Sequence, residues 1–93
     1  MNIKQYKDRV ANLGCIICGD PAHLHHPRTG VGTGQRNSDW LVIPLCPGHH
    51  TEGTTFMSPS VHGAPQFFRG RYGEEMALLA QVTERIMGGV RNV

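Results

Sequence analysis

The sequence has 93 residues, enough for one small domain, and a net charge of +2 with its histidines neutral. A domain of this size buries only about 60–65% of its unfolded surface, and its 12 glycines weaken the core further, so we expect an additional source of stability such as a bound metal. The polar start "MNIKQYKDRV" and the absence of any apolar run near ~20 residues predict neither a signal peptide nor a membrane span. We therefore expect a protein of a reducing cytoplasm.

The predicted elements begin with a helix that Asn2 caps with help from Gln5 and that Gly14 ends. Two short strands follow, over residues 22–27 ("AHLHHP") and residues 40–45 ("WLVIPL"). The second strand contains a proline, which predicts that it lies at an edge or ends there.

Loops are predicted over the glycine-rich residues 28–39 and over residues 51–60. A short helix over residues 64–73 and a longer one over about residues 74–88 complete the chain. The longer helix is expected to bury a stripe made of Met76, Leu79, Val82 or Thr83, and Ile86. The order of helix, strand, strand and helices predicts the α+β class.

The three cysteines are an odd number, which suits a disulfide framework poorly. Cys15 and Cys18 form a C-x2-C pair, and Cys46 and His49 form a C-x2-H pair. A hairpin between the pairs would bring four ligands to one tetrahedral zinc, and such a structural zinc contributes ~10–16 kcal/mol of apparent binding energy to folding. The alternative is three buried free cysteines and a surface histidine.

Two histidine doublets, His25-His26 and His49-His50, stand out in so short a chain. In extended chain, neighbouring side chains point to opposite faces, so a doublet can offer one ligand to an ion and aim its second imidazole elsewhere. We expect His49 to face the structural zinc and His50 to face a different metal. The alternative is a surface cluster of histidines that titrates near pH ~6.5 with no ion bound.

Five motifs occur in an order that resembles a nuclease family: "HHPRTGVG", "SDW", "PLCPGHH", "VHG" and "FFRGRYG". They are similar to those of the HNH, or ββα-metal, nucleases, and closest to the small phage-type members with a zinc knuckle that include the recombination enhancement nuclease Ref. The resemblance covers about residues 15–73. It implies a single HNH nuclease-like domain over residues 1–93, with the zinc knuckle and the ββα-metal core in residues 15–73 and helices on either side.

By this resemblance, His25, His50 and His62 would bind one catalytic divalent ion, and His26 would be the general base that activates water. The implied activity is that of a metal-dependent DNA endonuclease that hydrolyses phosphodiester bonds. The ion would be Mg²⁺, Mn²⁺, Ni²⁺, Co²⁺ or Zn²⁺, and the imidazole ligands favour the transition metals in the free protein.

The sequence departs from the family pattern in three places. The asparagine that HNH motifs carry five residues before the motif cysteine is replaced by Leu41, and its bracing role falls to Asn37 or Asp39. The helix that follows the motif in the family is interrupted here by glycine, proline and hydroxyl residues, which leaves the position of His62 open. An extra histidine, His23, on the first predicted strand is expected to be a bystander.

Four arginines are candidates for contacts with DNA phosphates, which position a duplex without reading its sequence: Arg28, Arg36, Arg69 and Arg71. The alternative for each is solvated surface charge. DNA is the expected partner, and the likeness to Ref adds a RecA-type recombinase filament as a second one. The alternative function is a zinc-dependent DNA-binding or adaptor module without catalysis.

Overall fold

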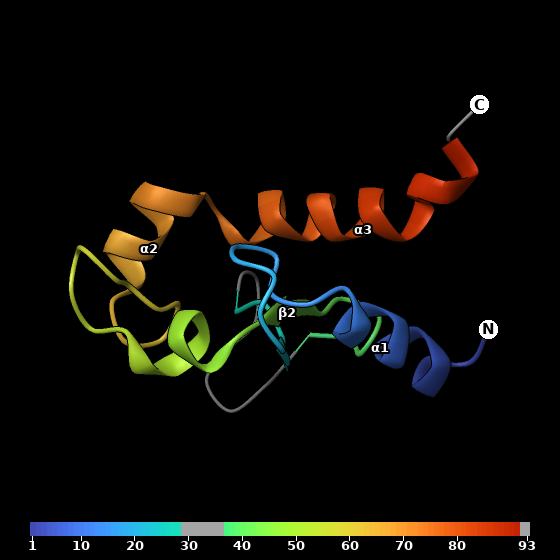
Figure 1. The fold of residues 1–93 in the computed structure, drawn as a ribbon, viewed down its shortest axis with the longest axis horizontal. Helices are drawn as coiled ribbons and strands as arrows, with labels where there is room; N and C mark the ends of the chain where they lie inside the picture. The colour runs from blue at the N-terminus through green and yellow to red at the C-terminus, as the bar shows by residue number, and fades with distance from the viewer. Residues whose placement is uncertain (29–36, 92–93) are drawn as a thin grey trace.

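The computed structural model describes residues 1–28 and 37–91, so most of the predicted loop over residues 28–39 lies outside it. The elements in chain order are α1 (Ile3–Asn12), β1 (His23–His25), β2 (Ile43–Leu45), the π-helical turn η1 (Gly48–Glu52), α2 (Pro65–Tyr72) and α3 (Glu75–Arg91). Figure 1 shows α3 running along one side of the molecule, with α1 and the strands beneath it and α2 at the opposite end from α1. This arrangement confirms the predicted α+β class.

Helix α1 begins and ends as its sequence predicts. The side-chain oxygen of Asn2 accepts a hydrogen bond from the Gln5 N–H at 2.9 Å, and the side-chain oxygen of Gln5 accepts one from the Asn2 N–H at 2.9 Å. These bonds satisfy donors that a helix start otherwise leaves without partners. The helix ends at Asn12, and Gly14 follows with φ +77°, a conformation that favours glycine.

Strands β1 and β2 pair antiparallel, in the register His23 with Leu45, Leu24 with Pro44 and His25 with Ile43. Both are three residues long, shorter than predicted. The carbonyl of Pro44 accepts a hydrogen bond from the Ile16 N–H at 2.9 Å, on the side of β2 away from β1. The prediction that this proline marks an edge is confirmed, and the bond attaches β2 to the loop that carries the first cysteine pair.

The hydrophobic core joins α1, β2, α2 and α3, and its fully buried side chains include Val10, Ile43, Leu45, Phe68, Leu78 and Val82. On α3 the predicted stripe is right at Val82, whereas Thr83 is exposed. It is wrong at Met76, which is 41% exposed, because the stripe begins instead at Glu75 and continues through Leu78. Glu75 turns inward because it has a buried partner, described below.

The turn η1 takes up the start of the loop predicted for residues 51–60. The N–H groups of His49 and His50 both point to the carbonyl of Cys46, at 3.0 and 2.8 Å. The chain then returns alongside η1, since the Val61 N–H donates to the His49 carbonyl at 2.8 Å and the His62 N–H donates to the His50 carbonyl at 3.1 Å. These bonds place His62 beside His50 although the sequence between them contains no continuous helix.

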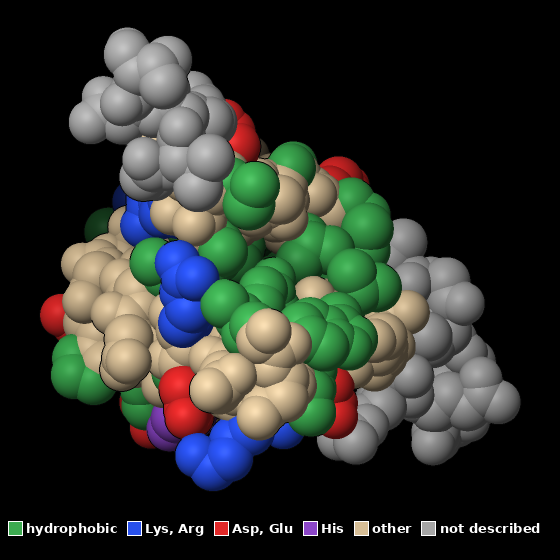
Figure 2. Space-filling view, turned by 90° about the vertical axis from the view of Figure 1, so that its right-hand side faces the viewer, with side chains coloured by type: hydrophobic (Ala, Val, Ile, Leu, Met, Phe, Trp, Pro, Cys, Tyr) green, Lys and Arg blue, Asp and Glu red, His purple; other side chains and the backbone are tan. Residues whose placement is uncertain are grey.

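The end of the molecule that carries α1 has a hydrophobic patch. Figure 2 looks onto that end, where hydrophobic side chains gather near the centre with charged side chains around them. On α1 the Tyr6 ring lies against Trp40, with ring centroids 5.0 Å apart, and Trp40 remains half-exposed. No helix in the described part of the chain is both long and apolar enough to cross a membrane.

Gly63 allows the returning chain to approach the end of η1. A Cβ at this position would lie 2.2 Å from the Gly53 carbonyl oxygen and 2.6 Å from the Ser60 hydroxyl. We expect Gly63→Ala to cost ~1–3 kcal/mol of unfolding free energy in thermal melts, because the two segments must separate. The matched control is Gly70→Ala on α2, where a Cβ meets nothing within 4 Å and a gain of ~0.5–1 kcal/mol is expected. Equal melting temperatures for the two variants would contradict this packing.

Candidate metal centres

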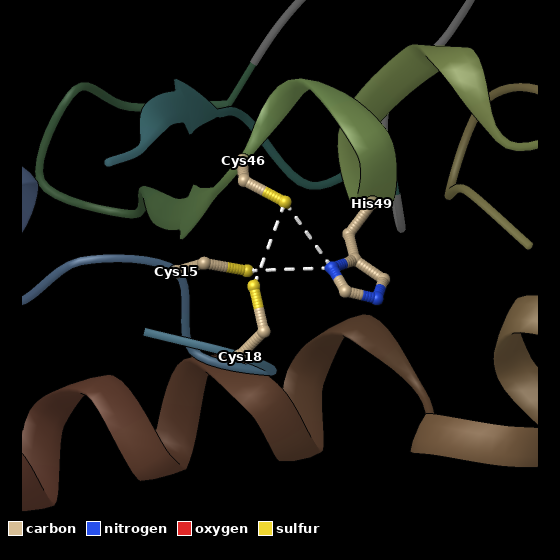
Figure 3. Close-up of side chains that lie close together, drawn as sticks. All are labelled: Cys15, Cys18, Cys46 and His49. Carbon is tan, nitrogen blue, oxygen red and sulfur yellow. Dashed lines mark hydrogen bonds between the residues drawn. The ribbon is translucent and has the colours of Figure 1, made fainter. Parts of the chain in front are cut away.

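The three cysteines and His49 form one compact group, called here the thiol cluster. Its ligand atoms all lie within 4.8 Å of one another. Figure 3 shows the side chains pointing toward a common centre, two from the loop after α1, one from just after β2 and one from η1. The measured separations are 3.7 Å for Cys15 Sγ to His49 Nδ1, 3.2 Å for Cys46 Sγ to His49 Nδ1, and 3.7 Å for Cys18 Sγ to Cys46 Sγ.

These separations fit a zinc-like ion. Tetrahedral bonds of ~2.3 Å to sulfur and ~2.0–2.1 Å to nitrogen place two sulfurs ~3.8 Å apart and a sulfur ~3.6 Å from a nitrogen. The sulfur–sulfur distance of 3.7 Å and the sulfur–nitrogen distances of 3.2 and 3.7 Å are close to these values. All three cysteines are free thiols, so the group could bind a metal such as zinc.

The pKa values of two thiols in the cluster, Cys15 and Cys18, shift in opposite directions. Burial raises the pKa of the Cys15 thiol, but hydrogen bonds from nearby backbone N–H groups outweigh burial and leave the pKa below its ordinary value. A backbone hydrogen bond from Asp20 lowers the pKa of Cys18, but desolvation and the two neighbouring thiols raise it to about 12. At neutral pH a metal must therefore displace protons from the cluster, and its affinity falls as pH falls.

A second group, the histidine cluster, consists of His25 on β1, His50 on η1 and His62 in the loop before α2. One ring nitrogen of each lies within 4.8 Å of the others, so this cluster could also hold a divalent ion. The ring centroids are 5.2 Å apart for His25 and His50, 5.0 Å for His25 and His62, and 4.8 Å for His50 and His62. The structure thus places the neighbours His49 and His50 in different clusters.

Burial favours the neutral form of His25, His49 and His50, which is the form that a metal binds. Burial lowers the pKa of His49 and of His25 below the ordinary value. Burial, and then repulsion from His25, His62 and His23, lowers the pKa of His50 to about 4. Protons therefore do not compete for His50 at neutral pH.

His25 has a partner that the sequence analysis missed. Its Nε2 lies 2.5 Å from Oε2 of Glu75, and the other oxygen of that carboxylate accepts the Arg28 backbone N–H at 2.9 Å. The side chains of His25 and Glu75 are both buried. A glutamate at the first turn of a helix is ordinary, so only its phase on α3, in line with Leu78 and Val82, could have indicated an inward position.

Asn37 and Asp39, the two candidates for the bracing role, both contact the segment His25–Arg28. The Asn37 side-chain amide donates a hydrogen bond to the Pro27 carbonyl at 2.7 Å. The Asp39 carboxylate lies 2.8 Å from Nε2 of His26. Each residue of the segment His25–Arg28 therefore has a hydrogen bond to a side chain from elsewhere in the chain.

The predicted DNA-binding arginines have different surroundings. A cavity of ≈ 320 Å³ is lined by Arg28, Val61, His62, Pro65, Arg69, Glu74 and Glu75. Arg71 lies away from it and donates hydrogen bonds to the carbonyls of Phe56 and Met57, and Arg36 lies outside the described residues. The extra histidine, His23, is exposed on β1, with its ring centroid 6.2 Å from that of His50.

Substitutions at the neighbouring residues His49 and His50 should distinguish the roles of the two clusters. We expect His49→Ala to lose zinc and several kcal/mol of stability, because a small core cannot replace a structural ion. His50→Ala should keep one tightly held zinc per chain and melt close to the wild type. Elemental analysis after dialysis and thermal melting check both variants. The same phenotype for both would refute the division of the doublet between two clusters.

Comparisons with known proteins agree with the motifs. The family model for recombination enhancement, RecA-dependent nucleases matches residues 2–87. The chain is also 30% identical over 89 residues to the uncharacterized protein YdfU of Escherichia coli (strain K12). That alignment covers 90% of this chain and 23% of YdfU, so the chain spans less than a quarter of the length of this relative. The family description implies a nuclease role in recombination, and the chain belongs to the family of recombination enhancement, RecA-dependent nucleases.

Proposed function

We propose that this chain is a metal-dependent DNA endonuclease of the HNH type, in which β1, β2 and η1 form a ββα-metal centre. The observation that carries the proposal is the convergence of three imidazoles on one point, with a fourth histidine, His26, next to the buried His25. Because the chain belongs to a nuclease family, the bond that it would hydrolyse is a phosphodiester. A divalent ion in the histidine cluster would supply Lewis-acid stabilisation of the scissile phosphate and the leaving oxygen.

His26 is the proposed general base. Its Nε2 is engaged by the Asp39 carboxylate, so in the neutral ring Nε2 carries the proton and Nδ1 carries the free lone pair. Nδ1 can then take a proton from the attacking water, and Asp39 stabilises the imidazolium that forms. Carboxylates that orient a histidine base in this way act by holding its tautomer and direction.

Arg28 and Arg69 are the proposed phosphate contacts, since both line the cavity that includes His62. Cationic side chains beside a metal ligand would hold the DNA backbone in place while leaving its sequence unread. Arg69 is 3.9 Å from Glu74, a distance at which a surface ion pair contributes little, so a phosphate can replace that partner. The RecA dependence in the family description supports DNA bound by a RecA-type filament as the substrate.

Removing the proposed base should slow catalysis without emptying the site. We expect His26→Ala to nick plasmid DNA at least ~100-fold more slowly, the usual effect of losing a general base, while its affinity for Co²⁺ or Mn²⁺ is unchanged. The control is His23→Ala on β1, three residues before His26, which should cleave at the wild-type rate. If His26→Ala cleaves as fast as the wild type, His26 is not the base.

The exposed ligand His62 should give a different signature. We expect His62→Ala to require a higher concentration of divalent ion for half-maximal nicking, because two imidazoles remain, and to recover part of its rate in excess metal. Rates measured across a metal titration check this result. A wild-type protein that cleaves neither single- nor double-stranded DNA with any of Mg²⁺, Mn²⁺, Ni²⁺, Co²⁺ or Zn²⁺ would favour the zinc-dependent binding or adaptor module instead.

A further inference from the structure

We propose that Glu75 is a positioning residue of the histidine cluster: its carboxylate fixes the ring of His25 so that Nδ1 faces the ion, and its charge strengthens that imidazole as a ligand. The role of the ion in DNA cleavage rests on the proposed function. The effect of Glu75 on the binding of an ion does not depend on it.

The burial of Glu75 indicates a specific purpose. It is 8% exposed, and the described part of the chain buries few other polar side chains, among them its partner His25, which is 2% exposed. Burying a carboxylate costs free energy unless the charge has strong hydrogen-bonding partners. Glu75 lies on the same buried face of α3 as Leu78 and Val82, where an apolar side chain would complete the core. A glutamate at this position gives up the stabilisation of an apolar side chain and contacts the His25 imidazole instead.

The two ring nitrogens of His25 have different roles, and the contact with Glu75 shows which one is the hydrogen-bond donor. A neutral imidazole has one N–H donor and one nitrogen with a free lone pair. Because Nε2 lies 2.5 Å from Oε2 of Glu75, Nε2 is the donor and Nδ1 is left to bind the ion. A carboxylate on the far nitrogen of a metal-bound histidine fixes the tautomer and the ring orientation and raises the basicity of the ligand.

The second oxygen of the same carboxylate extends the effect along the chain. Oε1 accepts the backbone N–H of Arg28 at 2.9 Å, so Glu75 holds both ends of the segment His25–Arg28. The start of α3 is thereby fixed to the cluster across 50 residues of sequence. A merely structural role for Glu75 would lower stability when it is removed but would leave metal affinity unchanged.

The test is a titration of Co²⁺ into zinc-loaded protein, followed by calorimetry and by visible absorption, with zinc content measured before and after. We expect ~10–100-fold weaker Co²⁺ binding in Glu75→Ala, the usual effect of removing a partner of a metal-bound histidine. Glu75→Gln should be weakened less, because its amide oxygen still accepts the Nε2–H but carries no charge. The matched control is Glu74→Gln, whose side chain is 74% exposed and should not alter Co²⁺ binding.

The proposal is overturned if Glu75→Gln binds Co²⁺ as tightly as the wild type, or if Glu74→Gln is weakened equally. Glu75→Gln decides the matter if Glu75→Ala loses its zinc and unfolds, since glutamine preserves the size of the side chain. A wild type that binds Co²⁺ but cuts no DNA would refute the proposed function and leave the role of Glu75 intact. A wild type that cuts DNA while both Glu75 variants keep full Co²⁺ affinity would refute the role of Glu75 alone.

Discussion

The carbonyl oxygen of Cys46 connects the two clusters, because the N–H groups of both His49 and His50 point to it. With two successive amides directed to one acceptor, the chain turns tightly and the two imidazoles leave it in different directions. His49 joins the thiol cluster and His50 joins the histidine cluster. A metal held in the first cluster would therefore order the turn that presents a ligand to the second.

The segment His25–Arg28 is held in place by hydrogen bonds to side chains from other parts of the chain. Glu75 on α3 and two side chains just before β2 supply hydrogen bonds to each of its residues in turn. Because β1 is only three residues long, its own pairing with β2 cannot fix the orientation of the imidazoles of its last residue, His25, and of the next residue, His26. The polar side chains around the segment do so, and they explain why carboxylates stand so close to a predicted cation site.

Local features of the fold could be predicted from the sequence because their causes are local. Asn2 and Gln5 bond to each other's backbone within one turn, and the C-x2-C and C-x2-H spacings bring paired ligands together within single turns. The position of Glu75 in line with Leu78 and Val82 is a weak signal, since a 3.6-residue period places Met76 on the buried face nearly as well as Glu75. The place of His62 depends on backbone bonds to η1, and the sequence gives no periodic sign of such pairing.

The contacts of Asn37 and Asp39 were likewise not predictable from the sequence, because both are short polar residues that can reach a backbone carbonyl or an imidazole. The resemblance to a nuclease family was confirmed by the match over residues 2–87. The resemblance left Asn37 and Asp39 as the two candidates for the bracing role and did not choose between them.

The three imidazoles of the histidine cluster differ in their access to solvent. His25 is buried, His50 is intermediate and His62 is exposed, so the cluster is closed on the side of the sheet and open on the side of the returning loop. That loop is attached to η1 through two backbone hydrogen bonds, from Val61 and His62. An ion leaving the cluster for bulk water would therefore pass His62, the imidazole that faces solvent. The residence time of that ion would depend on how firmly the loop is held against η1, while β1 and α3 determine the shape of the empty site.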